Sequence, residues 1–267
     1  SSHLAMIYSP SCLYFEHRLI RLHMIKKILR KTTKWLLILA FLSLLPIIIF
    51  RWAPAPGSML MVERWYAAKQ SGQPLTIQYQ WRPYEQIPDN MKMAVIASED
   101  QRFAKHCGFD LRGIREAIQH NMQGGTLRGG STISQQVAKN LFLWSDRSYL
   151  RKGVEVWFTL WIEILWPKQR ILEMYLNIAE WDRGVFGVDA AARTHFNIGA
   201  SYLSDRQASQ LAAVLPSPLN WDPVNPPQYA QRRAIWIQQQ MRQLGGREYL
   251  DKVEARSDWL AWFRLRY

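Results

Sequence analysis

One apolar segment constrains this chain more than any other feature of its sequence. WLLILAFLSLLPIIIFRW, residues 35–52, carries no charge until Arg51 and has a tryptophan at each end. A run of this length lies near the lower limit for crossing the roughly 30 Å hydrocarbon layer of a bilayer, and terminal tryptophans are typical of membrane interfaces. Pro46 is tolerated in a helix that lies in lipid. The segment therefore predicts one transmembrane helix.

The charges around this segment predict its orientation. Basic residues cluster ahead of it, against the single acid Glu16, whereas only Arg51 follows closely. The cluster consists of Arg18, Arg21, Lys26, Lys27, Arg30, Lys31 and Lys34. By the positive-inside rule, residues 1–34 form a cytoplasmic tail and the rest of the chain lies outside. A cleaved signal peptide is the alternative, because APAPG at 53–57 contains a small-x-small triplet, but its prolines and the long apolar run favour an uncleaved anchor.

Composition limits what can follow the anchor. The 267 residues carry a formal net charge of +13, and 48% of them are hydrophobic, which supports a packed domain. A basic surface suits acidic lipids or phosphorylated substrates. The sequence contains no zinc-ligand spacing and no dense basic-aromatic run, so nucleic acid is not an expected partner. Cys12 and Cys107 are the only cysteines, and the predicted membrane separates them, so no disulfide is expected.

Two regions follow the apolar segment. Residues 53–88 are rich in proline, glutamine and tyrosine and are expected to form a stalk with one short helix, MLMVERWYAAK. In residues 89–267 helical signals dominate, including capping boxes that start at Thr132 and Ser204 and a helix start at Pro167. One predicted helix places an apolar stripe along Leu150, Val154, Trp157, Trp161 and Leu165. No alternating segment of persuasive length is present, so this part is expected to be mainly α-helical.

The first candidate site is the pair Glu99 and Asp100 in ASEDQRFAKHCG, residues 97–108, where an apolar helix ends and His106 follows. Partial burial and a neighbouring like charge tune a carboxyl group for acid–base chemistry near neutral pH. A solvated helix end is the alternative, although the helix dipole disfavours acids there. Glu99 is therefore a candidate general base.

The second candidate site is GGSTISQQVAKN, residues 129–140. Two glycines lead to the hydroxyls of Ser131 and Thr132 at a helix start, where free backbone N–H groups favour an anion. Further polar donors in and after the motif are Gln135, Gln136, Lys139 and Arg147. The alternative is an ordinary capped helix with a solvated lysine.

The third candidate site is RKGVE, residues 151–155. On a helix, Arg151 and Lys152 share one face with Glu155. The group is either a surface ion pair, worth about 0.3–0.5 kcal/mol, or a second carboxylate held ionised by cations that also contact phosphate.

Four motifs in this order resemble those of the peptidoglycan glycosyltransferases, or murein polymerases, whose lysozyme-like domain also occurs in class A penicillin-binding proteins. E-D-x-x-F-x-x-H-x-G matches Glu99 to Gly108, and G-G-S-T-[IL]-x-Q-Q-x-x-K-N matches Gly129 to Asn140. R-K-x-x-E matches Arg151 to Glu155, and I-L-E-x-Y-L-N matches Ile171 to Asn177. The resemblance therefore extends over most of the predicted helical region.

The chain departs from this family's pattern at two places. Asp182 follows Trp181 where the family usually has glycine, and His195 precedes Phe196 where it usually has tyrosine. Both changes lie outside the acid and phosphate motifs, so they affect the expected loop shape rather than the reaction. The Ser-x-x-Lys and Lys-Thr-Gly motifs of bifunctional relatives are not found. A monofunctional enzyme of a Gram-negative inner membrane is therefore expected, with its catalytic domain in the periplasm.

The resemblance implies a mainly α, lysozyme-like fold with a small membrane-associated lobe, to which residues 107–122 contribute. It implies polymerisation of lipid II into β-1,4-linked glycan strands, with inversion at C1 of the donor MurNAc and release of undecaprenyl diphosphate. Glu99 is then the base, and Glu155 positions the leaving pyrophosphate. Implied partners are lipid II, the lipid-linked glycan chain, the membrane, and proteins of cell-wall synthesis or division.

The resemblance also assigns supporting roles. Residues expected to bind substrate are Lys139 and Arg147, supported by Arg151, Lys152, Ser131, Thr132, Gln135, Gln136 and Asn140. Asp100 supports Glu99 or a metal, and His106 is structural. A divalent cation, Mg²⁺ or Mn²⁺, is compatible with Glu155 but not required. The rival hypotheses are a lysozyme-like lytic transglycosylase or hydrolase, and a catalytically inert wall-binding scaffold at the membrane.

Overall fold

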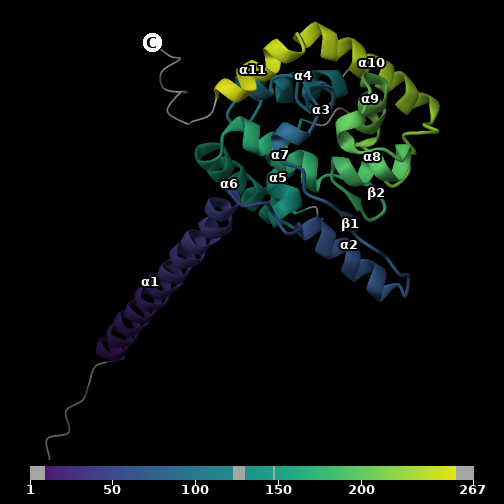
Figure 1. The fold of residues 1–267 in the computed structure, drawn as a ribbon. Helices are drawn as coiled ribbons and strands as arrows, with labels where there is room; N and C mark the ends of the chain where they lie inside the picture. The colour runs from purple at the N-terminus through teal and green to yellow at the C-terminus, as the bar shows by residue number, and fades with distance from the viewer. Residues whose placement is uncertain (1–9, 123–129, 147, 257–267) are drawn as a thin grey trace, which may run out of the picture. The chain divides into compact units, whose positions relative to one another are not determined.

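The chain divides into two compact units, Ser1–Ile49 and Phe50–Tyr267. The computed structural model describes residues 10–122, 130–146 and 148–256 (Figure 1). Most of the second unit is helical, as the sequence predicts.

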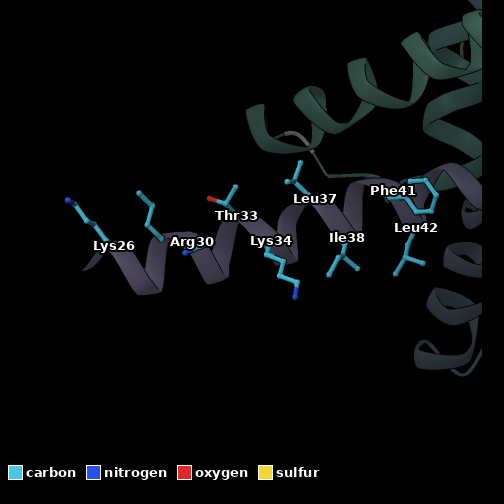
Figure 2. A pocket seen from close by; sticks show the side chains of 9 residues that line it. Lys26, Arg30, Thr33, Lys34, Leu37, Ile38, Phe41 and Leu42 are labelled. Atoms are coloured by element: carbon cyan, nitrogen blue, oxygen red, sulfur yellow. The ribbon is translucent and has the colours of Figure 1, made fainter. Parts of the chain in front are cut away.

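The first unit is built from helix α1 (Pro10–Phe50), which contains Pro46. Its portion His23–Phe50 is long and apolar enough to cross a membrane. Along this portion, basic side chains such as Lys26 and Lys34 precede apolar ones such as Phe41 (Figure 2). The predicted N-terminal apolar helix is therefore confirmed, and it extends back through the basic segment.

The second unit opens with α2 (Met59–Gln70), which confirms the predicted short helix. Ser58 caps α2 by accepting a hydrogen bond from the N–H of Met61, and Arg64 forms an ion pair of 2.9 Å with the buried Glu180. A small sheet follows in the strand order β1-β3-β2. β1 (Gln78–Tyr79) runs parallel to β3 (Val185–Phe186), and β2 (Glu180–Asp182) runs antiparallel to β3. These strands are too short to give a visible alternation in the sequence.

The remaining elements form a helical body. In chain order they are η1 (Tyr84–Gln86), α3 (Asp89–Glu99), η2 (Phe103–Lys105), α4 (Leu111–Met122), α5 (Ile133–Phe142), α6 (Tyr149–Leu165), α7 (Lys168–Ile178), α8 (Val188–Phe196), η3 (Ala200–Tyr202), α9 (Asp205–Val214), α10 (Gln228–Leu244) and α11 (Arg247–Ala255). Helix α3 packs against α9 and α10, and α5 packs against α6 and α7. Helices α3 and α7 are buried along most of their length, because apolar residues occupy almost every side of α3 and polar residues of α7 find internal partners.

The helix boundaries follow local chemistry. Thr132 and Ser204 each begin a complete capping box, as the sequence predicts. Pro167 precedes α7, and Gly245 ends α10 with a φ of 97°, a left-handed conformation that glycine adopts without strain. Thr132 thus fixes the start of α5, and Gly245 fixes the end of α10. Both helices contribute side chains to the site described below.

Helix α6 buries a different face from its apolar stripe. Its fully buried residues are Glu155, Thr159 and Ile162, whereas Leu150 is 75% exposed and Leu160 is 45% exposed. The predicted stripe thus exists in the sequence but does not mark the buried face of the helix. The buried face instead carries the carboxylate of the third motif.

Candidate active site

Glu99 is the last residue of α3, and its carboxylate is surrounded by donors from α3 itself, from α5 and from α10. The Nε2 of Gln136, on α5, donates to its Oε2 at 2.9 Å. The hydroxyl of Ser98 lies 2.8 Å from its Oε1, and the Nη2 of Arg233, on α10, lies 3.3 Å from the same oxygen. Tyr175, on α7, donates to the Oε1 of Gln136 at 3.2 Å. With a side chain only 14% exposed, Glu99 is held at the junction of α3, α5, α7 and α10.

Asp100 faces a different set of partners. Both of its carboxylate oxygens lie 2.9 Å from the Nε2 of His106, and its Oδ2 accepts a hydrogen bond from the N–H of Ile133 at 3.1 Å. Asp100 and His106 are both buried. The pair therefore ties the first motif to the first residue of α5, which orients the helix that carries Gln136 and Lys139.

The second motif separates into inward and outward residues. Thr132 and Gln135 are buried and satisfy each other in the capping box, and the hydroxyl of Thr132 also donates to the carbonyl of Gly108 at 2.6 Å. Asn140 is buried on the same helix, whereas Ser131 is exposed. The polar groups of Thr132 and Gln135 are thus engaged within the fold, and Gln136 is the amide that reaches Glu99.

The third motif forms a buried cation–carboxylate cluster on α6. The Oε2 of Glu155 lies 2.8 Å from the Nη1 of Arg151, and its Oε1 lies 2.5 Å from the Nζ of Lys152. Glu155 is 2% exposed. Each oxygen of this buried carboxylate therefore has its own cationic partner, as a buried acid requires.

Lys139 interacts electrostatically with both acidic groups, Glu155 and Glu99. Its residue is exposed, yet desolvation by the surrounding protein is the largest cause that lowers the pKa of its ammonium group. Glu155 and Glu99 both act to raise this pKa, while Arg151 and Lys152 act to lower it. Lys139, from the second motif, thus interacts with a carboxylate of the first motif and with one of the third. The three motifs therefore contribute to one site.

The donor set of this site does not fit a divalent cation. Both oxygens of Glu155 contact cationic side chains, and both oxygens of Glu99 accept hydrogen bonds. Within residues 10–122, 130–146 and 148–256, no cluster of three histidine, cysteine or acidic side chains suited to a metal is present.

The residues predicted from the sequence and the residues that the structure places at the site agree only in part. Arg147, predicted to bind phosphate, and Gly129 of the second motif lie outside the described residues. Three contacting residues were not predicted: Ser98, Tyr175 and Arg233. Tyr175 lies in the fourth motif, which could have indicated it, whereas Arg233 belongs to no motif and is brought to Glu99 by the packing of α10 on α3.

The two departures from the family pattern lie together. The Nε2 of His195 is 3.8 Å from an oxygen of Asp182, and its Nδ1 is 4.0 Å from Asp222. Burial lowers the pKa of His195, and the two aspartates partly offset this effect. Neither change touches the cluster around Glu99 and Lys139, so the two substitutions form a separate local pair.

A helical body that places a carboxylate and a cation cluster in one site defines a candidate glycosyl-transfer enzyme. The family model described as Transglycosylase matches residues 69–242, and the chain belongs to this family. It is 57% identical over 231 residues to a biosynthetic peptidoglycan transglycosylase of Pseudomonas aeruginosa, covering 86% of this chain and 100% of that relative. Proteins of the same name from Pseudomonas savastanoi, 56% identical, and Stutzerimonas stutzeri, 53% identical, match 88% and 90% of this chain and 100% of their own lengths. The chain is thus a peptidoglycan transglycosylase, a glycosyltransferase.

Proposed function

We propose that this enzyme polymerises lipid II into β-1,4-linked glycan strands with inversion at the anomeric carbon of the donor MurNAc. The observation that carries the proposal is the position of Lys139, whose ammonium interacts with both Glu99 and Glu155. A reaction that releases an anionic diphosphate needs a base at one end and positive charge at the other. The word biosynthetic in the relatives' names also favours synthesis over cleavage.

Glu99 acts as the base in this proposal. Its carboxylate takes the proton of the GlcNAc 4-hydroxyl of the acceptor as that oxygen forms its bond to C1 of the donor MurNAc. The C1–O bond to the lipid diphosphate breaks at the same time, and its electron pair leaves with the diphosphate. The hydrogen bond from Gln136 to Oε2 and the contact of Ser98 with Oε1 support this role, because they fix the carboxylate before substrate arrives.

The leaving diphosphate is stabilised at the cation cluster. Lys139 is the first contact, with Arg147 expected beside it from the second motif's continuation. Arg151 and Lys152 each pair with one oxygen of Glu155 and add positive charge near Lys139. Glu155 thus positions cations rather than reacting itself. This arrangement favours direct displacement, because charge leaves towards groups that are already positive.

We further propose that the enzyme works at the periplasmic face of the inner membrane, with residues 1–34 cytoplasmic and the lipid-linked substrates and glycan chain in the same bilayer. The apolar helix α1 supports this location. Exposed apolar residues of the second unit also suit a lipid surface, among them Val62 and Trp65 on α2 and Leu150 and Leu160 on α6. Such a location gives access to proteins of cell-wall synthesis or division.

The test supplies purified lipid II in detergent to the full-length protein. We expect polymer and free lipid diphosphate from the wild type, and neither from Glu99→Gln. Cleavage of finished glycan without consumption of lipid II would instead identify a lytic enzyme. Binding of glycan without either reaction would identify an inert scaffold, and both results would overturn the proposal.

A further inference from the structure

Arg233 lies far from every motif, but its guanidinium converges on the proposed base. Its Nη2 is 2.8 Å from the hydroxyl of Ser98, 3.2 Å from the Ser98 carbonyl and 3.3 Å from the Oε1 of Glu99. The side chain is 20% exposed. Three acceptors at one end of α3 thus share a single donor group from α10.

Ser98 links this donor to the carboxylate. Its hydroxyl lies 2.8 Å from the Oε1 of Glu99 and 3.1 Å from the carbonyl of Ala212, and its one proton can serve only one of them at a time. Arg233 donates to the Ser98 oxygen, so that hydroxyl proton must point towards Glu99 or Ala212. Ser98 and Arg233 together hold the Oε1 of Glu99 while Gln136 holds Oε2.

We propose that Arg233 is a positioning residue for the reaction, which acts through Ser98 and Glu99 by fixing the carboxylate. The inference rests on the proposed role of Glu99 as base. The charged groups that face Glu99 are Arg233 from α10 and Lys139 from α5, and Tyr175 faces it from α7. Of these, Arg233 is the cation in direct contact with a carboxylate oxygen.

An alternative role for Arg233 is direct contact with an anionic group of the substrate. Its Nε is buried without a hydrogen-bond partner among the described residues, so a donor remains. Loss of a substrate contact raises KM, whereas loss of a group that acts through the base lowers kcat. The two roles therefore separate in steady-state kinetics.

The experiment measures kcat and KM for lipid II in the full-length protein. Arg233→Gln should lower kcat roughly 10- to 100-fold with an unchanged KM, since a displaced base loses alignment with the hydroxyl. Arg233→Lys should recover part of kcat, because a long cationic donor remains at this position.

Arg232→Gln is the matched control, since this neighbouring arginine on α10 is exposed and the charge change is the same. Ser98→Ala provides a second route, because it removes the linking hydroxyl and should lower kcat with the KM unchanged even if Arg233→Gln folds poorly. A raised KM with an unchanged kcat, or kinetics equal to those of Arg232→Gln, would overturn the positioning role. A wild-type protein that does not polymerise lipid II would instead overturn the proposed function.

Discussion

Lys139 shows how the position of one side chain sets the chemistry of the site. The residue lies on the exposed side of α5, yet desolvation and the neighbouring Arg151 and Lys152 lower the pKa of its ammonium group. Glu155 and Glu99 oppose that shift. A cation held among other cations gains most when an anion arrives, because the diphosphate relieves their mutual repulsion.

This environment predicts the effect of removing the charge. Lys139→Ala should lower lipid II turnover by about 10²- to 10³-fold, the range typical for loss of one group that stabilises developing negative charge. Lys139→Arg should retain more activity than Lys139→Ala, because the positive charge remains. Thermal unfolding should be nearly unchanged in both, since the side chain is exposed. Wild-type turnover in Lys139→Ala, matching the exposed control Lys252→Ala, would refute the assignment.

His195 gives a prediction about stability instead of activity. Burial lowers its pKa in the folded protein, so the unfolded chain takes up a proton at a higher pH than the folded chain does. The free energy of unfolding therefore decreases as pH falls from the ordinary histidine value of about 6.5 towards the lower folded value. His195→Tyr should reduce this pH dependence, as measured by thermal unfolding in detergent above and below that range. Identical pH dependence in the two proteins would show that His195 is not responsible.

Single residues also show which parts of the site can be predicted from the sequence. Glu99, Lys139 and Glu155 stand in motifs whose chemistry is visible from spacing, and the structure places them in one electrostatic cluster. Thr132 and Gln135 stand in the same motif but close a buried cap, a role that the capping-box pattern also indicated. Arg233 could not be predicted, because its contact with Glu99 joins residues 134 positions apart through tertiary packing.

Among the elements, α5 connects most parts of the site. Its first turn is fixed by Thr132, by the carboxylate of Asp100 and by the carbonyl of Gly108, and its next turns carry Gln136 and Lys139. The geometry of the base and of the cation therefore depends on how this helix begins.

The two capping boxes allow a matched comparison of elements. Thr132→Ala and Ser204→Ala should each cost about 1 kcal/mol of stability through loss of the N-cap. Thr132→Ala should cost about 1 kcal/mol more, because its hydroxyl also donates to Gly108 in the interior. Thermal unfolding and turnover should be measured together, and we expect turnover to fall in Thr132→Ala alone. Equal loss of turnover in both variants would show that α5 has no special role.

Helix α6 shows what periodicity alone leaves open. The apolar stripe from Leu150 to Leu165 correctly predicted a helix, but it did not indicate that the buried face carries Glu155 and Thr159. Those two polar residues are buried because they find partners within the fold, Glu155 with Arg151 and Lys152 and Thr159 with the carbonyl of Glu155. The small sheet was missed for another reason, since strands of two or three residues have no measurable alternation.

At the scale of the whole molecule, the N-terminal apolar helix and the helical body were predictable because each depends on a pattern repeated over many residues. The apolar run, the capping boxes and the dense helical signals all appear in the structure. The segment 53–88 contributes α2, β1 and η1 to the second compact unit, through contacts such as the ion pair of Arg64 with Glu180. Contacts of this kind join distant residues and leave no local signal.

The two cysteines allow a test of the proposed orientation in the membrane. Cys107 is exposed in the second unit, and Cys12 lies ahead of the apolar segment. A membrane-impermeant maleimide applied to cells with a permeabilised outer membrane should label Cys107 and leave Cys12 unlabelled until lysis. Cys12→Ser and Cys107→Ser identify which residue reacts. Labelling of Cys12 before lysis would contradict the proposed topology.

The most direct test of the central claim is the pH dependence of lipid II turnover at saturating substrate in the wild type and in Glu99→Gln. A base must be ionised to accept a proton, so turnover of the wild type should fall along an acidic limb. We predict that Glu99→Gln lowers turnover by about 10²- to 10⁴-fold and that its residual activity lacks this limb. A Glu99→Gln enzyme with wild-type turnover and the same acidic limb would contradict the account.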